Sequence, residues 1–357
     1  MTRDDFHRAL AGSLPPRHSA SGSGTTEGGT GTWYDLGHLG VLGMRGRDAA
    51  KFLQGYLTCD LNSLAPTRWL LGALCNLQGR MVGNFTVSGD AEGVLLRMPV
   101  GVLPAVRQLL AKYAVFAKAK LVDETDDWVG LGLTGDAALA ALTASGVDAG
   151  SAAGAEMRAG ARVVLPDGEL MCRGGDRWEL WLHPAAALAA WQAMGLALPA
   201  HDIAEWHGAD IAAGLPWVQA TTSGEYLPQL FNLDRTEGLN FSKGCYLGQE
   251  IVTRLQHRGE AKRRTARFVV PAGSIEGDEV LDGTGRKVGE LVLVGRSPKG
   301  DTEALAVLER GAIDRSALDR GDHEDNPDDN PAQQYALTTS RGAVAVRKLP
   351  YALTDKA

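Results

Sequence analysis

The sequence predicts an α+β fold, and three observations lead to that class. Strand-like runs follow one another without the regular crossover helices of a parallel sheet, amphipathic helices stand between groups of such runs, and short strands with turn signals fill the C-terminal part. The chain has 357 residues, 44% of them hydrophobic, enough for two or three cores at ~150 residues per domain. We expect a flexible leader at 1–32, an α+β region of two lobes at 33–261 and a β-barrel at 262–357.

The N-terminal half gives these elements in order. Residues 19–32 are almost wholly Ser, Thr and Gly, a composition that buries too little apolar surface to order the chain. The spacing of apolar residues predicts helices at about 48–57, capped by Asp48, and at about 104–113. The segment 72–99 predicts two strands with a turn at Gly89-Asp90, and a further strand is expected at 115–122.

The rest of the chain alternates less regularly. Strands are expected at 128–135, 161–166 and 177–182, with an Ala-rich helix at 136–144 and two more helices near 185–195 and 202–213. After Arg267 the short strands indicate a small barrel, interrupted by an acidic, proline-containing loop at 319–331 that we expect to be solvated.

Charge and hydropathy exclude several classes of protein. A net charge of −7 argues against a protein whose whole surface binds nucleic acid, although the basic segment 254–267 could meet an anionic partner or simply be a solvated face. The longest apolar stretch, 185–200, contains Gln192 and Gly195 and falls short of the ~20 residues of a spanning helix, so we expect no membrane segment. The N-terminus lacks a secretion signal, so a cytoplasmic location is expected.

The cysteines are single thiols. Cys59, Cys75, Cys172 and Cys245 are far apart in the sequence, with no C-x-x-C pair, a pattern that fits neither a disulfide framework nor a zinc knuckle. We therefore expect no metal site formed by this chain alone.

The stretch "SKGCYLGQE" at 242–250 is the strongest candidate for chemistry. A helix is expected to begin near Gly248, which puts Cys245 in the loop before it and Lys243 two residues upstream. A helix N-terminus and a nearby ammonium both favour a thiolate, and the flanking glycines leave the sulfur accessible. The alternative is that Cys245 is a small buried hydrophobic residue, which is common for a free cysteine.

The same stretch carries a resemblance to a known family. "LPQ" at 227–229, "NL" at 232–233 and "KGCYLGQE" at 243–250 together resemble the signature of the YgfZ family of folate-binding proteins, relatives of the glycine-cleavage aminomethyltransferase. Further segments look like the family's in the same order, at 45–61, 112–121, 206–216 and 348–353. The resemblance implies a three-lobed ring of two α+β lobes and a C-terminal barrel around a folate pocket.

The resemblance also implies a function. Family members are implicated in building or repairing iron-sulfur clusters, including those of tRNA methylthiotransferases. It therefore implies tetrahydrofolate or another folate as cofactor and iron-sulfur proteins as partners. Contact with tRNA is possible, and indirect contact is expected over direct contact. Cys245 is the position that matches the family's assigned cysteine, and Lys243 stands beside it in the motif.

Three positions are candidates for the folate pocket. Trp206 matches a folate-contacting tryptophan of the family, although its helical spacing also fits an ordinary core residue; a second such tryptophan is Leu39 here. The aspartate on which the sister transferases rely falls at Asn84, and an amide cannot take a proton as a carboxylate does. We thus expect an accessory factor, thiol-active or non-enzymatic. The alternatives are a folate-dependent one-carbon transferase and a purely structural interaction module.

Overall fold

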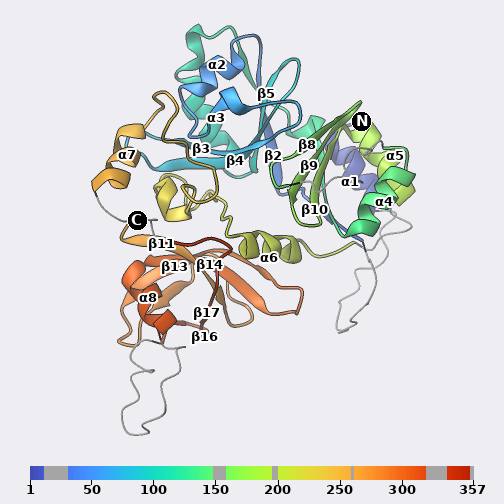
Figure 1. Cartoon of the computed structure of the whole chain (residues 1–357). Helices are drawn as coiled ribbons and strands as arrows, with labels where there is room; N and C mark the ends of the chain where they lie inside the picture. The colour runs from blue at the N-terminus through green and yellow to red at the C-terminus, as the bar shows by residue number, and fades with distance from the viewer. Residues whose placement is uncertain (12–30, 148–157, 195–199, 259–260, 319–335, 354–357) are drawn as a thin grey trace. The chain divides into compact units, whose positions relative to one another are not determined.

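The computed structural model describes residues 1–11, 31–147, 158–194, 200–258, 261–318 and 336–353 (Figure 1). The predicted acidic loop at 319–331 and most of the predicted leader lie outside these ranges. The described chain forms two compact units, each built from separate stretches. Unit 1 comprises Met1–Phe52, Leu61–Leu70 and Thr86–Asp202, and unit 2 comprises Leu53–Asp60, Leu71–Phe85 and Ile203–Ala357. The three-part division expected from the sequence stays a prediction.

Helices and strands are mixed throughout, which confirms the predicted α+β class. The α-helices are α1 (Arg3–Ala11), α2 (Ala49–Gln54), α3 (Leu103–Ala111), α4 (Asp136–Ala144), α5 (Pro184–Met194), α6 (Ile203–Ala213), α7 (Gln249–Arg258) and α8 (Arg310–Leu318). The strands are β1 (Thr32–Asp35), β2 (Leu39–Arg45), β3 (Leu70–Cys75), β4 (Met81–Gly89), β5 (Gly93–Pro99), β6 (Lys120–Asp123), β7 (Val129–Thr134), β8 (Arg162–Leu165), β9 (Gly168–Gly174), β10 (Arg177–Leu182), β11 (Arg263–Val269), β12 (Glu279–Leu281), β13 (Lys287–Arg296), β14 (Thr302–Glu309), β15 (Thr338–Thr339), β16 (Gly342–Ala343) and β17 (Ala345–Arg347).

Unit 1 contains an antiparallel sheet of order β1-β7-β10-β9-β8, with α1, α4 and α5 on one face (Figure 1). The three helices and the sheet share one core, which includes Leu133, Leu139 and Trp191. Phe6 and Leu10 of α1 are buried in that core, with exposed fractions of 0% and 4%. The prediction of a flexible leader is therefore wrong for residues 3–11, because their apolar side chains have a core to cover.

A second sheet has the order β3-β4-β5-β2-β6, and β4 passes from unit 2 into unit 1 within its own length. β5 pairs antiparallel with both β2 and the second half of β4. The sequence predicted two strands between 72 and 99, and the structure has three, because a tight turn at Asn76–Arg80 separates β3 from β4. The Oδ1 atom of Asn76 accepts the N–H groups of Gln78 and Arg80 in that turn, both at 3.0 Å.

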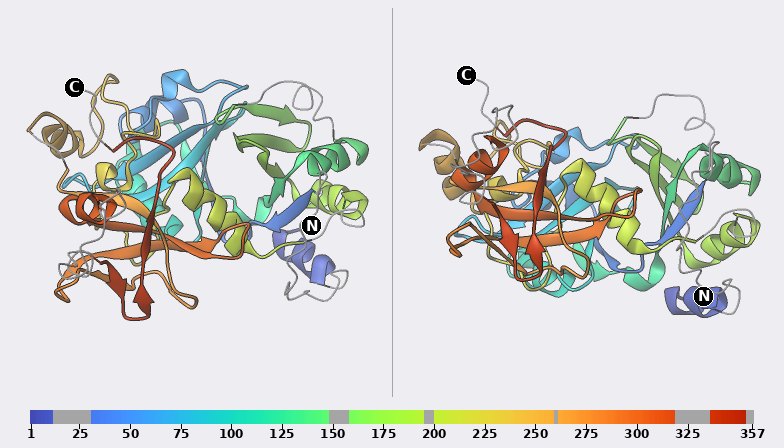
Figure 2. Two further views of the ribbon diagram at one scale, coloured as in Figure 1. Left: turned by 60° about the horizontal axis from the view of Figure 1, so that its bottom comes forward. Right: turned by 90° about the horizontal axis from the view of Figure 1, so that it is seen from below.

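Unit 2 contains the predicted C-terminal barrel, a nearly closed antiparallel sheet of order β16-β15-β12-β13-β14-β11-β17. Its core includes Phe268, Val280 and Leu291. Helix α6 lies along β13 and β14, as both views of Figure 2 show. The approach depends on Gly208, since a Cβ there would lie 1.8 Å from the carbonyl oxygen of Arg296.

Candidate functional site

The loop before α7 carries the one exposed thiol of the chain. All four cysteines lie in described residues; Cys245 is exposed, and Cys59, Cys75 and Cys172 are buried. α7 begins at Gln249, so the predicted place of Cys245, in a loop just before a helix, is confirmed. The alternative prediction, that Cys245 is a small buried hydrophobic residue, is wrong.

Side chains on both sides of Cys245 fix the backbone of the loop. The Oδ1 atom of Asn240 accepts the backbone N–H groups of Ser242 and Lys243 at 2.7 and 2.9 Å. On the helical side, the backbone N–H of Tyr246 donates to Gln249 Oε1 at 3.1 Å, and the Gln249 N–H donates to the Tyr246 carbonyl at 3.1 Å. The first of these bonds corresponds to the half of a capping box in which a Glu or Gln side chain reaches back three residues to a backbone N–H. Cys245 therefore projects from a segment that is held at both ends.

Lys243 braces a second segment rather than the thiol. Its Nζ atom donates to the carbonyl oxygens of Gln54, Leu57 and Cys59 at 2.8, 2.7 and 2.7 Å. An ammonium has three hydrogens, so all three are used. The residue is only 9% exposed, and burial lowers the pKa of Lys243 from its usual value. A role for Lys243 in holding a Cys245 thiolate stays a prediction, and this geometry does not supply a hydrogen bond for it.

The two glycines of the motif have different roles. Gly248 has φ +80°, and a Cβ there would lie 2.3 Å from the carbonyl oxygen of Asn76, so the loop packs directly on the β3–β4 turn only with glycine. A Cβ at Gly244 would meet nothing within 4 Å. The space beside Cys245 is therefore open, as the sequence predicted, and only Gly248 is required by the backbone.

The other three thiols, unlike Cys245, are buried. Burial raises the pKa of Cys59 and of Cys75 to about 12, and burial also raises the pKa of Cys172. A thiol must ionise to act as a nucleophile or as a metal ligand. These three side chains are thus inert at neutral pH, which leaves Cys245 as the thiol available for chemistry.

Two buried amide side chains in the first half of the signature hold neighbouring elements, α7 and β11. Gln229 donates from Nε2 to the carbonyl oxygen of Val252 in α7 at 2.7 Å. Asn232, at φ 57°, donates from Nδ2 to the carbonyl oxygen of Thr265 at 2.9 Å. Both side chains are buried. Neither residue stands out in the sequence as a functional side chain; the signal that points to them is two amides inside the apolar run "LPQLFNL".

The candidate folate residues do not form a ready pterin site. Trp206 in α6 is 2% exposed, and it does not present a ring face to a ligand. Asn84 is also 2% exposed; its Nδ2 donates to the Pro216 carbonyl at 2.8 Å and its Oδ1 accepts the Val218 N–H at 2.7 Å. Leu39 is buried in β2 and belongs to unit 1, whereas the other two belong to unit 2. As they stand, these residues do not fit folate, and their assignment to it stays a prediction.

Comparison with known proteins decides the family. A family model described as "GCVT N-terminal domain" matches residues 30–206. The "tRNA-modifying protein YgfZ" of Edwardsiella ictaluri is 33% identical over 280 residues, which are 75% of this chain and 81% of that protein. The chain belongs to the YgfZ family. The YgfZ protein of Pectobacterium carotovorum is 29% identical over 332 residues, which are 91% of this chain and 92% of the relative.

The fold of this YgfZ-family chain also has a solved counterpart. The aminomethyltransferase T of the glycine cleavage system from Bartonella henselae superposes with a TM-score of 0.67 at 18% identity, over 90% of this chain and 86% of the other. At that identity the likeness concerns the fold. The predicted aminomethyltransferase-like architecture is thereby confirmed.

The described part of this YgfZ-family chain gathers no metal-ligand cluster, and its basic segment is partly paired. Within the described ranges, no three side chains of His, Cys, Asp or Glu gather as a metal site would require. The basic segment 254–267 is partly neutralised, because Arg264 pairs with Asp234 at 2.6 Å and Arg267 pairs with Glu303 at 2.7 Å. No helix of the described chain is both long and apolar enough to cross a bilayer.

Proposed function

We propose that this chain is a folate-binding accessory factor for the assembly or repair of iron-sulfur clusters, which supports tRNA-modifying, methylthiolating enzymes. The observation that carries the proposal is the exposed Cys245 on a loop fixed by Asn240 and Gln249. Relatives at 29% to 33% identity bear the name tRNA-modifying protein. We expect the protein to act in the cytoplasm.

The chemistry proposed for Cys245 follows from its setting. A thiolate is a soft ligand for iron and a nucleophile toward sulfur, and its reach depends on access. The fixed loop presents the sulfur to a partner without first having to order itself, which lowers the cost of association. The partner we propose is an iron-sulfur protein such as a tRNA methylthiotransferase.

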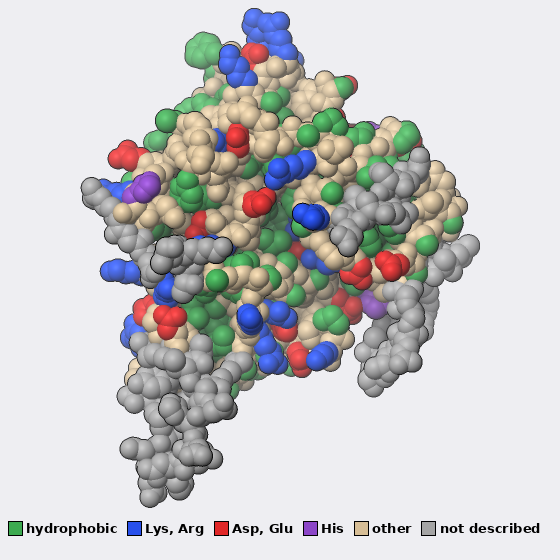
Figure 3. Space-filling view, viewed as in Figure 1, with side chains coloured by type: hydrophobic (Ala, Val, Ile, Leu, Met, Phe, Trp, Pro, Cys, Tyr) green, Lys and Arg blue, Asp and Glu red, His purple; other side chains and the backbone are tan. Residues whose placement is uncertain are grey.

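Contact with tRNA is proposed to be indirect. On the face shown in Figure 3, Lys and Arg side chains stand among Asp and Glu side chains rather than in a field of one sign. A direct nucleic-acid interface needs a continuous basic patch or stripe. The internal ion pairs of Arg264 and Arg267 support the same proposal for the segment 254–267.

The aminomethyltransferase-like fold supports the folate part of the proposal. When bound, a folate supplies one-carbon chemistry or a redox-active pterin. Because Trp206 is buried and both ends of the Asn84 amide are bonded, we derive no step through folate. Binding is tested by titrating tetrahydrofolate against tryptophan fluorescence, in the wild type and in Trp206→Phe, which keeps an aromatic ring in the core. An unchanged affinity in Trp206→Phe removes this residue from the pocket.

The second candidate, a folate-dependent aminomethyltransferase, is disfavoured by Asn84. Its amide bridges the backbone at 216 and 218 and carries no charge or titrating proton. The accessory-factor proposal predicts no methylenetetrahydrofolate from aminomethyl-lipoyl carrier and tetrahydrofolate. Turnover at ~1 per second or faster would replace it by the transferase.

Complementation of a deletion strain tests the accessory role. The full chain is expected to restore 2-methylthio nucleosides in tRNA, measured by mass spectrometry, and Cys245→Ser is expected not to. Gly244→Ala is the matched control, since a Cβ there meets nothing within 4 Å and the thiol is kept. Full complementation by Cys245→Ser would reject the thiol as the functional group.

A further inference from the structure

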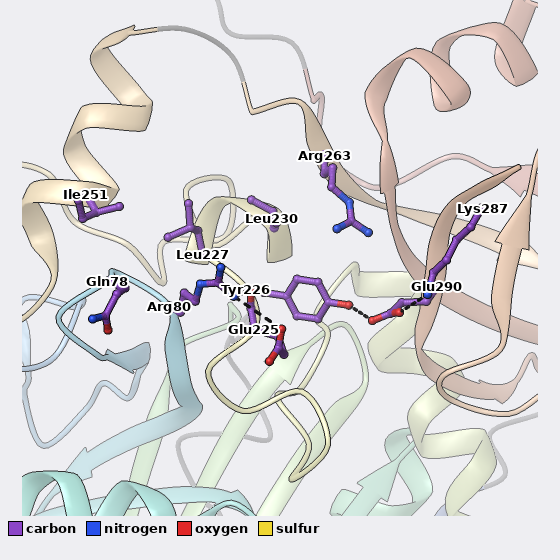
Figure 4. Close-up of a pocket in the computed structure, with 10 residues that line it drawn as sticks. All are labelled: Gln78, Arg80, Glu225, Tyr226, Leu227, Leu230, Ile251, Arg263, Lys287 and Glu290. Carbon is purple, nitrogen blue, oxygen red and sulfur yellow. Dashed lines mark hydrogen bonds and ion pairs between the residues drawn. The ribbon is translucent and has the colours of Figure 1, made fainter.

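A cavity of about 630 Å³ lies in unit 2 (Figure 4). Its lining comes from the β3–β4 turn, the segment 225–230, α7 and the barrel strands β11 and β13. Cavities of about 300 to 1,000 Å³ are typical of small-molecule sites. None of Trp206, Asn84 and Leu39 lines it, so it is separate from the positions considered for folate.

One wall of the cavity is apolar. It consists of Leu227, Leu230 and Ile251, and Ile251 is 36% exposed. Gly79 lets this wall close up, because a Cβ there would lie 3.0 Å from Ile251 Cβ and 3.2 Å from Leu227 Cδ2. The wall can therefore bury an apolar or aromatic group of a ligand.

The opposite side carries polar and charged side chains, most of which are hydrogen-bonded or ion-paired with one another. The Tyr226 hydroxyl donates to Glu290 Oε1, and Lys287 Nζ lies 3.2 Å from Glu290 Oε2 (Figure 4). Burial acts to raise the pKa of Glu290, but the hydrogen bonds from Tyr226 and Lys287 outweigh it and hold that pKa below its usual value. Glu290 is thus ionised, and the positive charges of Lys287 and Arg263 both act on it. Arg80 is paired in turn with Glu225 at 3.6 Å.

Arg263 differs from its neighbours in this cavity. It is half-buried in β11, and Figure 4 shows its guanidinium turned toward the Tyr226–Glu290 pair. Among the described residues, that guanidinium makes no hydrogen bond and no ion pair, and its charge acts on Glu290 and Tyr226 without direct contact. Lys287 pairs with Glu279 at 3.0 Å as well as with Glu290, so the charges of this region balance, and Arg263 differs from Arg80 and Lys287 in that its guanidinium N–H groups are unbonded within the described chain. A guanidinium matches the geometry of a carboxylate or a phosphate.

We propose that this cavity binds a small organic anion, in which a carboxylate or phosphate group meets Arg263 and an apolar or aromatic body lies against Leu227, Leu230 and Ile251. A neutral ligand would offer the guanidinium N–H groups a weaker acceptor than an anion does, and a cation would be repelled by Arg263. The carboxylate and phosphate classes share this chemistry and are distinguished by the test. The proposal does not depend on the function proposed for Cys245.

Titration calorimetry on the full chain tests the site with four probes. Benzoate and phenyl phosphate carry the anion on a flat apolar body, benzamide is the neutral counterpart of benzoate, and inorganic phosphate lacks the apolar body. Wild type is expected to bind at least one aryl anion at least tenfold more tightly than benzamide and inorganic phosphate. Tighter binding of benzoate assigns a carboxylate ligand, and tighter binding of phenyl phosphate assigns a phosphate ester.

Two variants locate the binding. Arg263→Gln is expected to weaken the preferred aryl anion at least tenfold, the loss expected for one charge-assisted contact of ~1.4 kcal/mol or more. Arg341→Gln is the matched control, because Arg341 is a barrel arginine paired with Asp278 at 2.9 Å and does not line the cavity. Equal affinity in Arg263→Gln and wild type would overturn the proposal. So would equal binding of benzoate and benzamide by wild type, an outcome that does not depend on any variant folding.

Discussion

Replacing Lys243 by methionine distinguishes two roles of this residue: stabilising the fold through its hydrogen bonds, and holding a Cys245 thiolate. Methionine keeps an unbranched apolar stem of similar length and removes the ammonium. The three carbonyl oxygens of Gln54, Leu57 and Cys59 then lose their common donor. If Lys243 acted chiefly on the Cys245 thiolate, the change would affect reactivity and leave stability nearly intact.

The expected loss of stability follows from the contacts. The bonds to Leu57 and Cys59 are buried, and the bond to Gln54 is only partly so. A buried carbonyl left without a donor costs ~1–3 kcal/mol, so the two buried ones together cost ~2–6 kcal/mol. Burial lowers the pKa of Lys243, so removing its charge returns part of this cost. We expect a net loss of ~2–4 kcal/mol, which lowers Tm by ~5–15 °C at this size.

Thermal unfolding followed by far-UV circular dichroism measures this loss. Lys299→Met is the control, since Lys299 lies in the exposed turn between β13 and β14 and its replacement should stay within ~0.5 kcal/mol. A Lys243→Met protein that melts within about 2 °C of wild type would refute the bracing role. The catalytic role would then gain support if iodoacetamide labelling of Cys245 slowed in the same variant.

Three further outcomes are expected. Iodoacetamide should label native protein at one thiol, and Cys245→Ser should abolish the label while Tm stays within a few degrees; labelling of a second thiol by the folded protein would contradict the burial described. The pKa of about 12 for Cys59 and Cys75 exceeds the 9.0 of a free thiol, so the stability they confer is complete below pH 9 and is lost between pH 9 and 12. Urea unfolding at pH 8 and at pH 10 gives the loss of stability over that range, which should be ~1 kcal/mol smaller in Cys75→Ala than in wild type. Equal losses in the two proteins would contradict the raised pKa of Cys75. Asn84→Asp removes the donor to the Pro216 carbonyl and should cost ~1–3 kcal/mol in urea unfolding without creating aminomethyl transfer; a variant as stable as wild type would reject the bridging role.

The sequence was sufficient for the elements that carry strong local signals. The helices near 136–144 and 185–195, the barrel strands and the loop before α7 follow from periodicity, turn residues and glycine. The third strand between 72 and 99 was missed because Asn76, rather than a glycine-rich pair, organises its turn. Asp48 stands directly before α2 as predicted, and its carbonyl accepts the Phe52 N–H, but its side chain accepts the backbone N–H of Lys118 at 3.0 Å, a contact 70 residues away that no local pattern encodes.

The sequence predicted where the candidate site lies, but it did not predict which contact each of its residues makes. Sequence proximity suggested that Lys243 serves Cys245, whereas the ammonium meets a segment nearly 190 residues earlier in the chain. Arg263 and Ile251 were not singled out at all, because a cavity is formed by elements that come together only in the folded chain. Long-range contacts of this kind depend on topology, which a single sequence does not specify residue by residue.

The motif around Cys245 therefore combines one available thiol with residues that fix its backbone. Lys243 joins the loop to the segment 54–59, Gly248 seats it on the β3–β4 turn, and Gln249 closes the first turn of α7. An ordered loop loses little conformational entropy when a partner binds, so the free energy of contact is available for association. Substitutions of the bracing residues should then lower stability and activity together, whereas loss of the thiol should abolish activity at unchanged stability. These two patterns distinguish a functional thiol from a merely structural loop.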